Sequence, residues 1–520
     1  MVIVDAMENF RRKRPLINKD LLDGSDSGPI ATIGSRPYLV AAISILIIAT
    51  ILRLPHLGVS LGFDEALYAN NARTTLQNLI ELTRSNYSSP LGLPLVLFVI
   101  EKFSVSAWIV RAPSVVFSVG AIAVILALPR VGIVRGYCLA VAAVLAISPQ
   151  QIRYAQEARE YALSVFVVAT LVYLFFKYLD KGSVRNLVSL AIGIAATPFL
   201  AYGSCFAALA IIVCIAFIPS DRATKRWLLD TVVMIAAFVA AAVISYVTIA
   251  KYQKHQRLYW YLLQNYPPRV EGSAVAWVGH SLEWLWVSFS NYIGAQFGGY
   301  ETAGLFVFLL VVTLSRFVLK PSRLRQEPIL LLFVVLVGGS VAAAFLRLYP
   351  FGAIRQQLYA APVVILATVR AGALLWSRFD IQWRRLTFGG MAAIVLVASA
   401  MRIPATYGVR EDIRSAVTIG LKDADPKNVY VYYMAVPAVD FHYPDSGFKR
   451  GTPGNIATMA DEAIQVASAG KLYLLFSEIQ NNDDDLLIAE LRARGWIVVR
   501  DDRYIGSRAL YLKCAKCEGG

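Results

Sequence analysis

The chain alternates between long apolar runs and short polar segments. The first apolar run, Pro37 to Leu54, has the length that a helix needs to cross a bilayer, about 17–25 residues. Further apolar stretches follow near residues 112–128, 136–148, 161–177, 186–199, 202–218, 228–250, 302–319, 328–346, 357–376 and 386–402. This pattern predicts an α-helical polytopic membrane protein with about eleven transmembrane helices.

The polar segment after the first run has a helical pattern of its own. Between Asp64-Glu65 and Arg84, apolar residues form one stripe, and Asn, Gln, Arg and Thr residues occupy the opposite face. The stripe contains Tyr68, Ala72, Leu76, Leu79 and Ile80. We therefore expect a juxtamembrane helix over 66–84 that lies on the membrane surface.

Residues 91–107 are apolar but contain Glu101-Lys102, so they can either cross the membrane or lie flat at its surface. The distribution of basic residues decides between these arrangements. If the segment lies flat, the basic loops share one side with the basic tail over 1–36, as the positive-inside rule requires; if it crosses, each of them changes side. We therefore place the N-terminus in the cytoplasm and the C-terminus outside. The basic loops contain Arg130/Arg135, Lys177/Lys181/Arg185, Arg222/Lys225/Arg226, Lys320/Arg323/Arg325 and Arg378/Arg384/Arg385.

The same topology gathers the unusual polar residues of the membrane domain, residues 37–403, on its outer face. The outer segments are 55–111, 148–161, 251–300 and 347–356. From about Pro404 the composition changes, and residues 404–520 are expected to form a soluble α/β domain, also outside. Its expected strands are 428–435, 471–476, 496–500 and 509–513, and its expected helices are 461–469 and 483–494.

Composition agrees with this class of protein. Hydrophobic residues make up 57% of the chain and charged residues 16%, whereas soluble domains have about 45–50% and about 25%. The net charge of +15 comes from basic residues between the spans, so we expect membrane lipid and no nucleic acid as a partner. The sequence has no phosphate-binding P-loop, dinucleotide fingerprint, His-Glu-x-x-His or Gly-x-Ser-x-Gly motif. No cofactor is expected to be required, and no metal site is indicated.

Asp64 and Glu65 are the first candidates for catalysis, because two adjacent carboxylates follow the first span. Neighbouring residues of a helix point about 100° apart, so the two groups can have different roles. One can deprotonate an acceptor hydroxyl while the other holds a basic group or a metal ion. The structural alternative is that both acids complement the positive end of a helix.

A second group of candidates lies in residues 148–161. Arg153 and Glu157 are four residues apart and can pair on one helical face, which leaves Arg159 available to an anion. The alternative is a structural ion-pair cluster at the end of a span. Arg355 follows the turn Tyr349-Pro-Phe-Gly352 and can bind a phosphate, or can serve as an anchor whose charge reaches the membrane boundary.

The long outer loop over 251–300 is rich in aromatic residues, which suit sugar rings and lipid headgroups. His255 and Trp260 are candidate substrate contacts there, although an interfacial belt of Trp and Tyr explains the same pattern.

These motifs together resemble the type C (GT-C) glycosyltransferases, in the branch of bacterial protein mannosyltransferase-like and lipid A-modifying enzymes, which transfer aminoarabinose or galacturonic acid. The resemblance covers roughly residues 36–402. It rests on the order and spacing of Asp64-Glu65, Ser89-Pro90-Leu91, Arg111-Ala-Pro-Ser114, Ser148-Pro149 with Gln156-Glu157-Ala-Arg159-Glu-Tyr161, and Tyr349-Pro-Phe-Gly352 with Arg355 and Pro362.

The resemblance implies transfer of one sugar from a polyprenyl-phosphate donor to a lipid, glycan or protein acceptor outside the cytoplasm of a bacterium, at the inner membrane. Asp64 then matches the family's general base, with inversion at the anomeric carbon, and Glu65 the acid beside it. Arg159 lies in the family's second outer-loop signature and Arg355 in a later outer loop that handles the carrier phosphate, and we expect both to bind the donor phosphate. We assign Arg153 and Tyr349 to the same group and Glu157, Tyr68 and Tyr161 to substrate contacts. Leu67 and Ser89 replace an arginine and a lysine of the related aminoarabinose transferases.

The chemistry is coherent with these residues, because a lipid phosphate is already a leaving group. The protein needs only a base for the acceptor and cations for the departing phosphate. Two other functions remain open at this point. A flippase or transporter of lipid-linked sugars would place polar residues near the middle of the spans, where this chain has few. An anchored scaffold would not need eleven spans.

Overall fold

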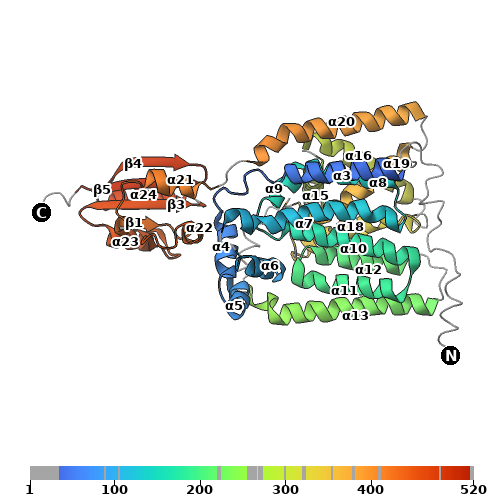
Figure 1. Cartoon of the computed structure of the whole chain (residues 1–520), viewed down its shortest axis with the longest axis horizontal. Helices are drawn as coiled ribbons and strands as arrows, with labels where there is room; N and C mark the ends of the chain where they lie inside the picture. Colours follow the sequence, from blue (N-terminus) through green and yellow to red (C-terminus); the bar gives the residue numbers. More distant parts are fainter. Residues whose placement is uncertain are drawn as a thin grey trace.

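A bundle of long helices and a small sheet domain at one end of it make up the chain (Figure 1). The structure is a computed structural model and describes residues 34–86, 89–103, 106–218, 224–253, 266–267, 273–297, 300–318, 324–352, 355–376, 381–407, 411–478 and 482–515. The bundle contains α3 (Ser35–Ile51), α7 (Ala107–Ala127), α8 (Arg135–Ile147), α10 (Tyr161–Lys181), α11 (Val184–Leu200), α12 (Ser204–Phe217), α13 (Thr224–Thr248), α16 (Tyr300–Val318), α18 (Pro328–Phe345), α19 (Ala361–Trp376) and α20 (Ile381–Thr406). Each predicted span falls on one of these helices.

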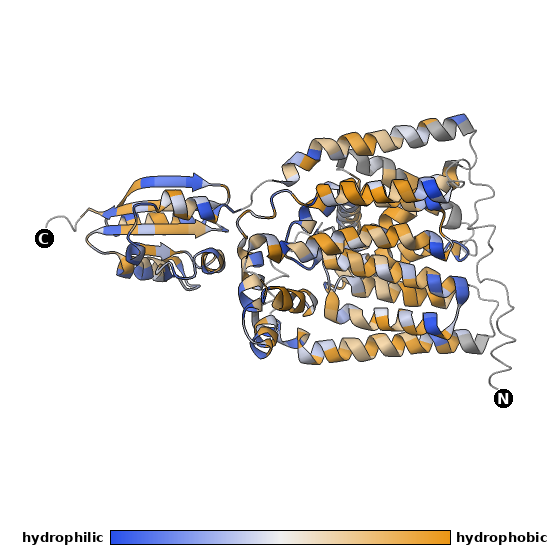
Figure 2. Cartoon of the chain, in the orientation of Figure 1, coloured by the Kyte–Doolittle hydropathy of each residue, from blue (hydrophilic) through white to orange (hydrophobic). Residues whose placement is uncertain are grey.

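The bundle helices have the apolar character of membrane spans. Among the described residues, six helical stretches are long and apolar enough to cross a membrane, and α3, α8, α11 and α12 are shorter apolar helices beside them. Hydrophobic residues run along the bundle, whereas hydrophilic residues gather at its ends (Figure 2). The chain is therefore a helical membrane protein, and the crossing number of eleven stays a prediction.

The segment between α3 and α7 lies at the end of the bundle that faces the sheet domain (Figure 1). It holds α4 (Phe63–Ala72), α5 (Leu76–Asn86) and α6 (Gly92–Ile100). At about 1.5 Å per residue, α6 is too short to cross a bilayer, in agreement with the flat arrangement of 91–107. The predicted single helix over 66–84 is wrong in one respect, because the chain leaves the helix at Arg73 and α5 begins a new one.

A second correction concerns the outer segment 251–300, which we expected to be a loop. It contains α15 (Ala274–Gln296), a 23-residue helix with Ser273 as its N-cap. The side chain of Ser273 accepts the backbone N–H of Ala276, which satisfies one of the free donors of the first turn.

The sheet domain has five strands in the order β2-β1-β3-β5-β4. β1 is parallel to β2 and β3, and β5 is antiparallel to β3 and β4. The four predicted strands and two predicted helices are present with shifted ends. The strand predicted over 428–435 ends early, at Val431, and α22 follows it. Neither α22 nor β2 was expected. The elements are α21 (Ile413–Ser415), β1 (Val429–Val431), α22 (Val436–His442), β2 (Lys449–Arg450), α23 (Ile456–Val466), β3 (Lys471–Ser477), α24 (Asp483–Ala493), β4 (Trp496–Tyr504) and β5 (Ser507–Cys514).

Hydrogen bonds join segments that are far apart in sequence at the end of the bundle near the sheet domain. The contacts join Leu52 to Tyr407 at 2.8 Å, Gln151 to Gln296 at 3.3 Å and Ser89 to Gln253 at 2.7 Å. Residues far apart in sequence therefore meet in one polar layer, and the short helix α9 (Pro149–Ala155) belongs to it.

Arg53 fixes the helix ends beneath this layer. Its side chain is fully buried and donates to the Ser118 hydroxyl and to the carbonyls of Ala49, Leu145 and Ala146, at 2.8–3.0 Å. These carbonyls lie in the last turns of α3 and α8, where backbone acceptors lack helical partners and a cation is favourable. Arg53 therefore joins α3, α7 and α8 where the chain turns toward α4.

Candidate active site

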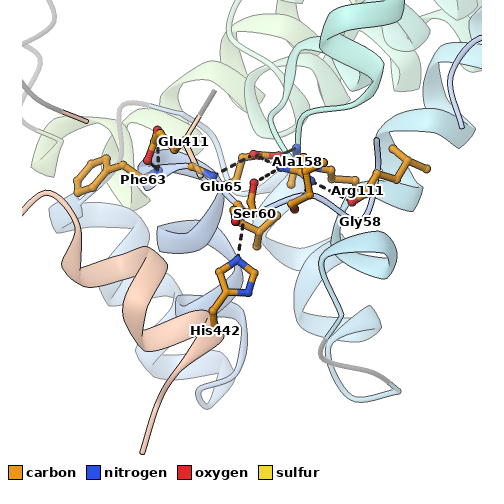
Figure 3. Close-up of polar contacts among 12 residues, drawn as sticks. Gly58, Ser60, Phe63, Glu65, Arg111, Ala158, Glu411 and His442 are labelled. Atoms are coloured by element: carbon orange, nitrogen blue, oxygen red, sulfur yellow. Dashed lines mark hydrogen bonds and ion pairs between the residues drawn. The ribbon is translucent and has the colours of Figure 1, made fainter. Parts of the chain in front are cut away.

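Glu65 lies in the first turn of α4 and is almost completely enclosed by donors. Arg111, at the start of α7, binds it with two nitrogens, Nε to Oε1 at 2.8 Å and Nη2 to Oε2 at 2.6 Å. The backbone N–H of Ala158 adds a bond of 2.8 Å, and that of Gly62 adds one of 3.3 Å (Figure 3). Burial alone would raise the pKa of Glu65, but Arg111 and these N–H groups outweigh it and lower the pKa below its ordinary value.

Arg111 also organises the chain before α4. Its guanidinium donates to the carbonyls of Leu57, Val59 and Ser60 at 2.8–3.0 Å. A single buried cation therefore joins the approach to α4, the first turn of α4 and α7. Bidentate pairing of this kind fixes orientation as well as charge.

Asp64, the neighbour of Glu65, has a different environment. Its side chain is 47% exposed and forms an ion pair with Arg159, whose own side chain is only 16% exposed. Arg159 lies 3.5 Å from the carboxylate of Glu160 as well. Burial would lower the pKa of Arg159, but the nearby Asp64 carboxylate raises it well above its ordinary value. The structure thus holds an accessible carboxylate beside a permanently charged cation.

Aromatic rings hold Arg159 in place. Its guanidinium carbon lies 5.4 Å from the ring centroids of both Tyr68 and Tyr161, within the range of cation–π contacts. The Tyr68 hydroxyl bonds Ser89 and donates to Glu160 at 3.3 Å. Tyr68, Tyr161 and Arg159, all predicted site residues, therefore form one cluster with Asp64.

Arg153 and Glu157 lie beside the first turn of α4. They do not share a helical face as we expected, because α9 ends at Ala155 and the chain turns before Glu157. Both nevertheless line one cavity of about 40 Å³ between α4, α7, α9 and the end of α20. His56 and Tyr407 also line this cavity, with ring centroids 5.6 Å apart.

Arg355 and Tyr349 approach the cluster from the loop after α18. Arg355 is half-buried and interacts electrostatically with Tyr161. The Tyr349 hydroxyl donates to the Gln356 carbonyl at 3.0 Å, and its ring packs on Phe206 with centroids 5.1 Å apart. The predicted substrate contacts His255 and Trp260 lie outside the described residues. No group of three or more His, Cys, Asp or Glu side chains in the described ranges could hold a metal ion.

The sheet domain contacts the chain around Asp64 directly. Both carboxylate oxygens of Glu411 accept the backbone N–H of Phe63, at 3.2 and 3.3 Å, and the Nε2 atom of His442 accepts that of Leu61 at 3.1 Å (Figure 3). The phenyl ring of Phe63 packs against the core of the sheet domain. Burial, followed by the charges of Arg414 and Arg111, lowers the pKa of His442 to about 3, so its imidazole is neutral and one ring nitrogen can accept a hydrogen bond.

Glu411 belongs to a pair of carboxyl groups. It is 7% exposed and accepts the Ser477 hydroxyl at 2.7 Å, and it also shares a hydrogen bond with Glu478. Two carboxyl groups can share a hydrogen bond only when one of them is protonated. Burial and then Glu478 raise the pKa of Glu411 to about 9.

This pair predicts a pH-dependent stability. A folded-state pKa above the ordinary 4.5 means that the pair stabilises the protein fully below pH 4.5 and loses this contribution as the pH rises toward 9. The groups facing Glu411 are the Phe63 N–H, the Ser477 hydroxyl and the Glu478 carboxyl. Since one pKa unit corresponds to about 1.4 kcal/mol, we expect thermal unfolding in detergent to reveal a loss of more than about 1.4 kcal/mol between pH 5 and 9. Glu478→Gln should flatten this dependence, and an unchanged pH profile in that variant would contradict the pairing.

No sequence pattern marks Glu411 or His442 as partners of α4, and Arg111 entered the family resemblance without an assigned role. A signal for Arg111 does exist, because an arginine at the start of an apolar span is costly unless it has a buried acceptor. Glu411 and His442 have no comparable signal, since both lie in a domain that is more than three hundred residues away in sequence.

Comparison with known proteins identifies similar structures at low sequence identity. No protein-family model and no curated protein matches the sequence. ArnT from Cupriavidus metallidurans bound to undecaprenyl phosphate is similar with a TM-score of 0.52 and 14% identity, over 92% of this chain and 98% of that one. The apo state of the same protein gives a TM-score of 0.50 and 13% identity, over 94% and 99%.

An oligosaccharyltransferase is also similar in structure. The Archaeoglobus fulgidus enzyme, tethered to an acceptor peptide that contains the NVT sequon, has a TM-score of 0.51 and 11% identity, over 85% of this chain and 69% of that one. The described bundle with its sheet domain therefore shares its fold with these proteins.

Proposed function

We propose, on the premise that the chain has the type C glycosyltransferase (GT-C) fold, that it transfers a single sugar from a polyprenyl-phosphate donor to an extracytoplasmic acceptor. The observation that carries the proposal is the accessible Asp64 carboxylate beside the enclosed cation Arg159. A base and a phosphate-binding cation are the two groups that this reaction needs. Undecaprenyl phosphate in the similar ArnT structure and the acceptor peptide in the oligosaccharyltransferase structure support the same choice of substrates.

In the proposed reaction, Asp64 accepts the proton of an acceptor hydroxyl. The hydroxyl oxygen attacks the anomeric carbon of the donor sugar, and the bond from this carbon to the phosphate oxygen breaks. The phosphate leaves with the bonding electrons, opposite to the attacking oxygen, so the anomeric configuration inverts. Arg159 and Arg355 stabilise the negative charge on the departing phosphate, and the low dielectric at the membrane boundary strengthens this effect.

Glu65 has a positioning role in this proposal. Its two oxygens are occupied by Arg111 and by the backbone N–H groups of Ala158 and Gly62, which leaves it poorly placed to take a proton. It holds the first turn of α4 against α7 and so aims Asp64. The acid pair therefore divides into one reacting and one supporting carboxylate.

One of the two positions at which related aminoarabinose transferases have a basic residue, Ser89, lies beside the Tyr68–Arg159 cluster. Ser89 takes the place of the lysine and bonds the Tyr68 hydroxyl, and the Tyr68 ring in turn contacts Arg159. The charge that the lysine would supply is therefore absent, but Arg159 lies close to the same position. We assign the donor phosphate to Arg159 and Arg355, with Tyr349 and Arg153 as further donor contacts. Tyr68, Tyr161, Glu157, His255 and Trp260 are proposed substrate contacts, and the proposed reaction requires no cofactor.

We further propose that the protein lies in a bacterial inner membrane with the N-terminus in the cytoplasm. The basic loops between spans support this orientation. Asp64, Arg159 and the sheet domain then lie on the periplasmic side, where an extracytoplasmic acceptor is accessible.

A transfer assay tests the proposed function. The full chain in detergent or nanodiscs would be incubated with synthetic polyprenyl-phosphate sugars and an envelope extract. We expect release of polyprenyl phosphate and formation of a glycoside with inverted configuration. If the protein instead moves a labelled lipid-linked sugar across a vesicle bilayer without releasing polyprenyl phosphate, the transporter alternative holds.

Arg159→Gln tests the donor assignment. Removing one electrostatic group from the leaving phosphate should lower the transfer rate about 10²–10³-fold. Arg159→Lys should retain part of the activity, because it keeps the charge but not the planar fork of donors. Steady-state kinetics with the polyprenyl-phosphate donor would measure both. Arg185→Gln, an exposed basic residue at the start of α11, is the control, and near-normal transfer by Arg159→Gln would refute the assignment.

A further inference from the structure

The helix that carries Asp64 is short and depends on contacts from elsewhere. α4 has ten residues, and isolated helices of fewer than about 12–15 residues are marginal in water. Its N-cap is Gly62, which has no side chain to accept a free N–H of the first turn. Glu65 reaches back to the Gly62 N–H, but the Phe63 N–H needs another acceptor.

Glu411 of the sheet domain supplies that acceptor. Both of its oxygens accept the Phe63 N–H, and its carboxyl group fills the space beside Gly62. A Cβ atom built on Gly62 would lie 2.7 Å from Oε1 of Glu411, closer than such atoms approach in proteins. The glycine and the glutamate therefore form a divided N-cap, with the backbone from one domain and the capping group from the other.

Further contacts secure the approach to α4. The backbone N–H of Arg414 donates to the Ser60 hydroxyl at 3.3 Å, and Nη1 of Arg414 donates to the Gly58 carbonyl at 3.1 Å. His442, whose Nδ1 lies 3.4 Å from the Arg414 guanidinium, accepts the Leu61 N–H of the same segment. The sheet domain thus contacts the backbone from Gly58 to Phe63.

The other end of α4 is held by α22. The side-chain amide of Asn70 donates to the Pro437 carbonyl at 2.8 Å, and the guanidinium of Arg73 lies 4.4 Å from the centroid of the Phe441 ring. Both ends of a ten-residue helix are therefore bound by one domain, while its inner face is bound by Arg111 through Glu65.

From these contacts we infer that the sheet domain is a working part of the active site, in which Glu411 caps α4 from the other domain and so positions Asp64. This inference rests on the proposed function for its catalytic consequence. A domain that only recognised an acceptor would not need to satisfy the backbone of the helix that carries the base. Glu411 and His442 are positioning residues in this scheme, because they act on Asp64 through α4.

A pair of variants tests this role. In Glu411→Ala, hydrogen–deuterium exchange of the amides over 61–66 should become about tenfold faster, the equivalent of a lost N-cap. The transfer kcat should fall about tenfold while KM for the donor stays nearly constant, because α4 carries the base and Arg159 lies elsewhere. Gly62→Ser alone should also lower kcat, since its Cβ displaces Glu411.

The decisive variant combines both changes. Gly62→Ser with Glu411→Ala gives the helix a serine N-cap of its own and the room to use it, so exchange protection and kcat should recover to within about twofold of the wild type. Glu462→Gln, which alters a carboxylate bonded to Thr452 and Tyr430 within the sheet domain, is the matched control. Unchanged amide exchange in Glu411→Ala, or no recovery in the double variant, would overturn the inference. If the wild type transfers no sugar, the proposed function fails, and the exchange measurements alone decide the capping role.

Discussion

Replacing Asp64 with asparagine is expected to lower the rate of sugar transfer by about 10²–10⁴-fold, the usual contribution of a positioned general base. Asparagine has nearly the same shape as aspartate but cannot accept the proton of an acceptor hydroxyl. The side chain is 47% exposed and is not part of the buried network around Glu65, so we expect folding and membrane insertion to be retained. The measurement is single-turnover transfer with a polyprenyl-phosphate donor at saturating acceptor.

Two checks make this result specific. Asp445→Asn, an exposed carboxylate of the sheet domain, should transfer at the wild-type rate. Donor binding, measured as retention of labelled polyprenyl phosphate, should survive in Asp64→Asn because the phosphate cations remain. Near-normal turnover of a correctly inserted Asp64→Asn protein would reject the assignment of the base.

Arg111→Leu is expected to have the largest effect on stability. The change leaves the Glu65 carboxylate buried beside apolar side chains and removes the donors for the Leu57, Val59 and Ser60 carbonyls. Breaking a buried ion pair from one side costs about 3–5 kcal/mol, because the remaining charge has lost its counter-ion. Thermal unfolding of the purified protein in detergent would measure this loss.

The double variant Arg111→Leu with Glu65→Leu separates stability from positioning. It removes the stranded charge and should recover a large part of the lost stability. Transfer should stay low, since α4 no longer has its link to Arg111 and to the Ala158 N–H. Arg494→Leu, which breaks a surface pair with Glu490, should change stability much less. Equal losses in Arg111→Leu and Arg494→Leu would contradict the buried-pair account.

The architecture of the bundle was predictable because a bilayer imposes length and composition on each span. The position of α6 shows this clearly. Its segment is apolar enough to be mistaken for a span, but the charges of the loops favour a flat arrangement, and a nine-residue helix cannot cross. The break after Ala72 was not predictable from periodicity, because the apolar stripe continues in phase from α4 into α5.

The candidate site was predictable only in part, for a physical reason. Asp64, Arg159, Tyr68 and Tyr161 stand out as polar or aromatic residues next to apolar runs, and the structure brings them together. The different surroundings of Asp64 and Glu65 could not be predicted from two adjacent residues of the sequence. That difference depends on Arg111 and Ala158, which approach from α7 and from the turn before α10. The contacts of Glu411 and His442 depend on how two domains pack, which no local pattern encodes.

The divided N-cap has an evolutionary consequence. Because the space beside residue 62 holds either a capping side chain or the Glu411 carboxylate, the two positions are constrained to change together over time. Homologues that acquire serine, threonine or aspartate at the first position should lose the acid at the second. A lineage that loses the contact between the sheet domain and the bundle would first have to acquire a capping side chain at position 62.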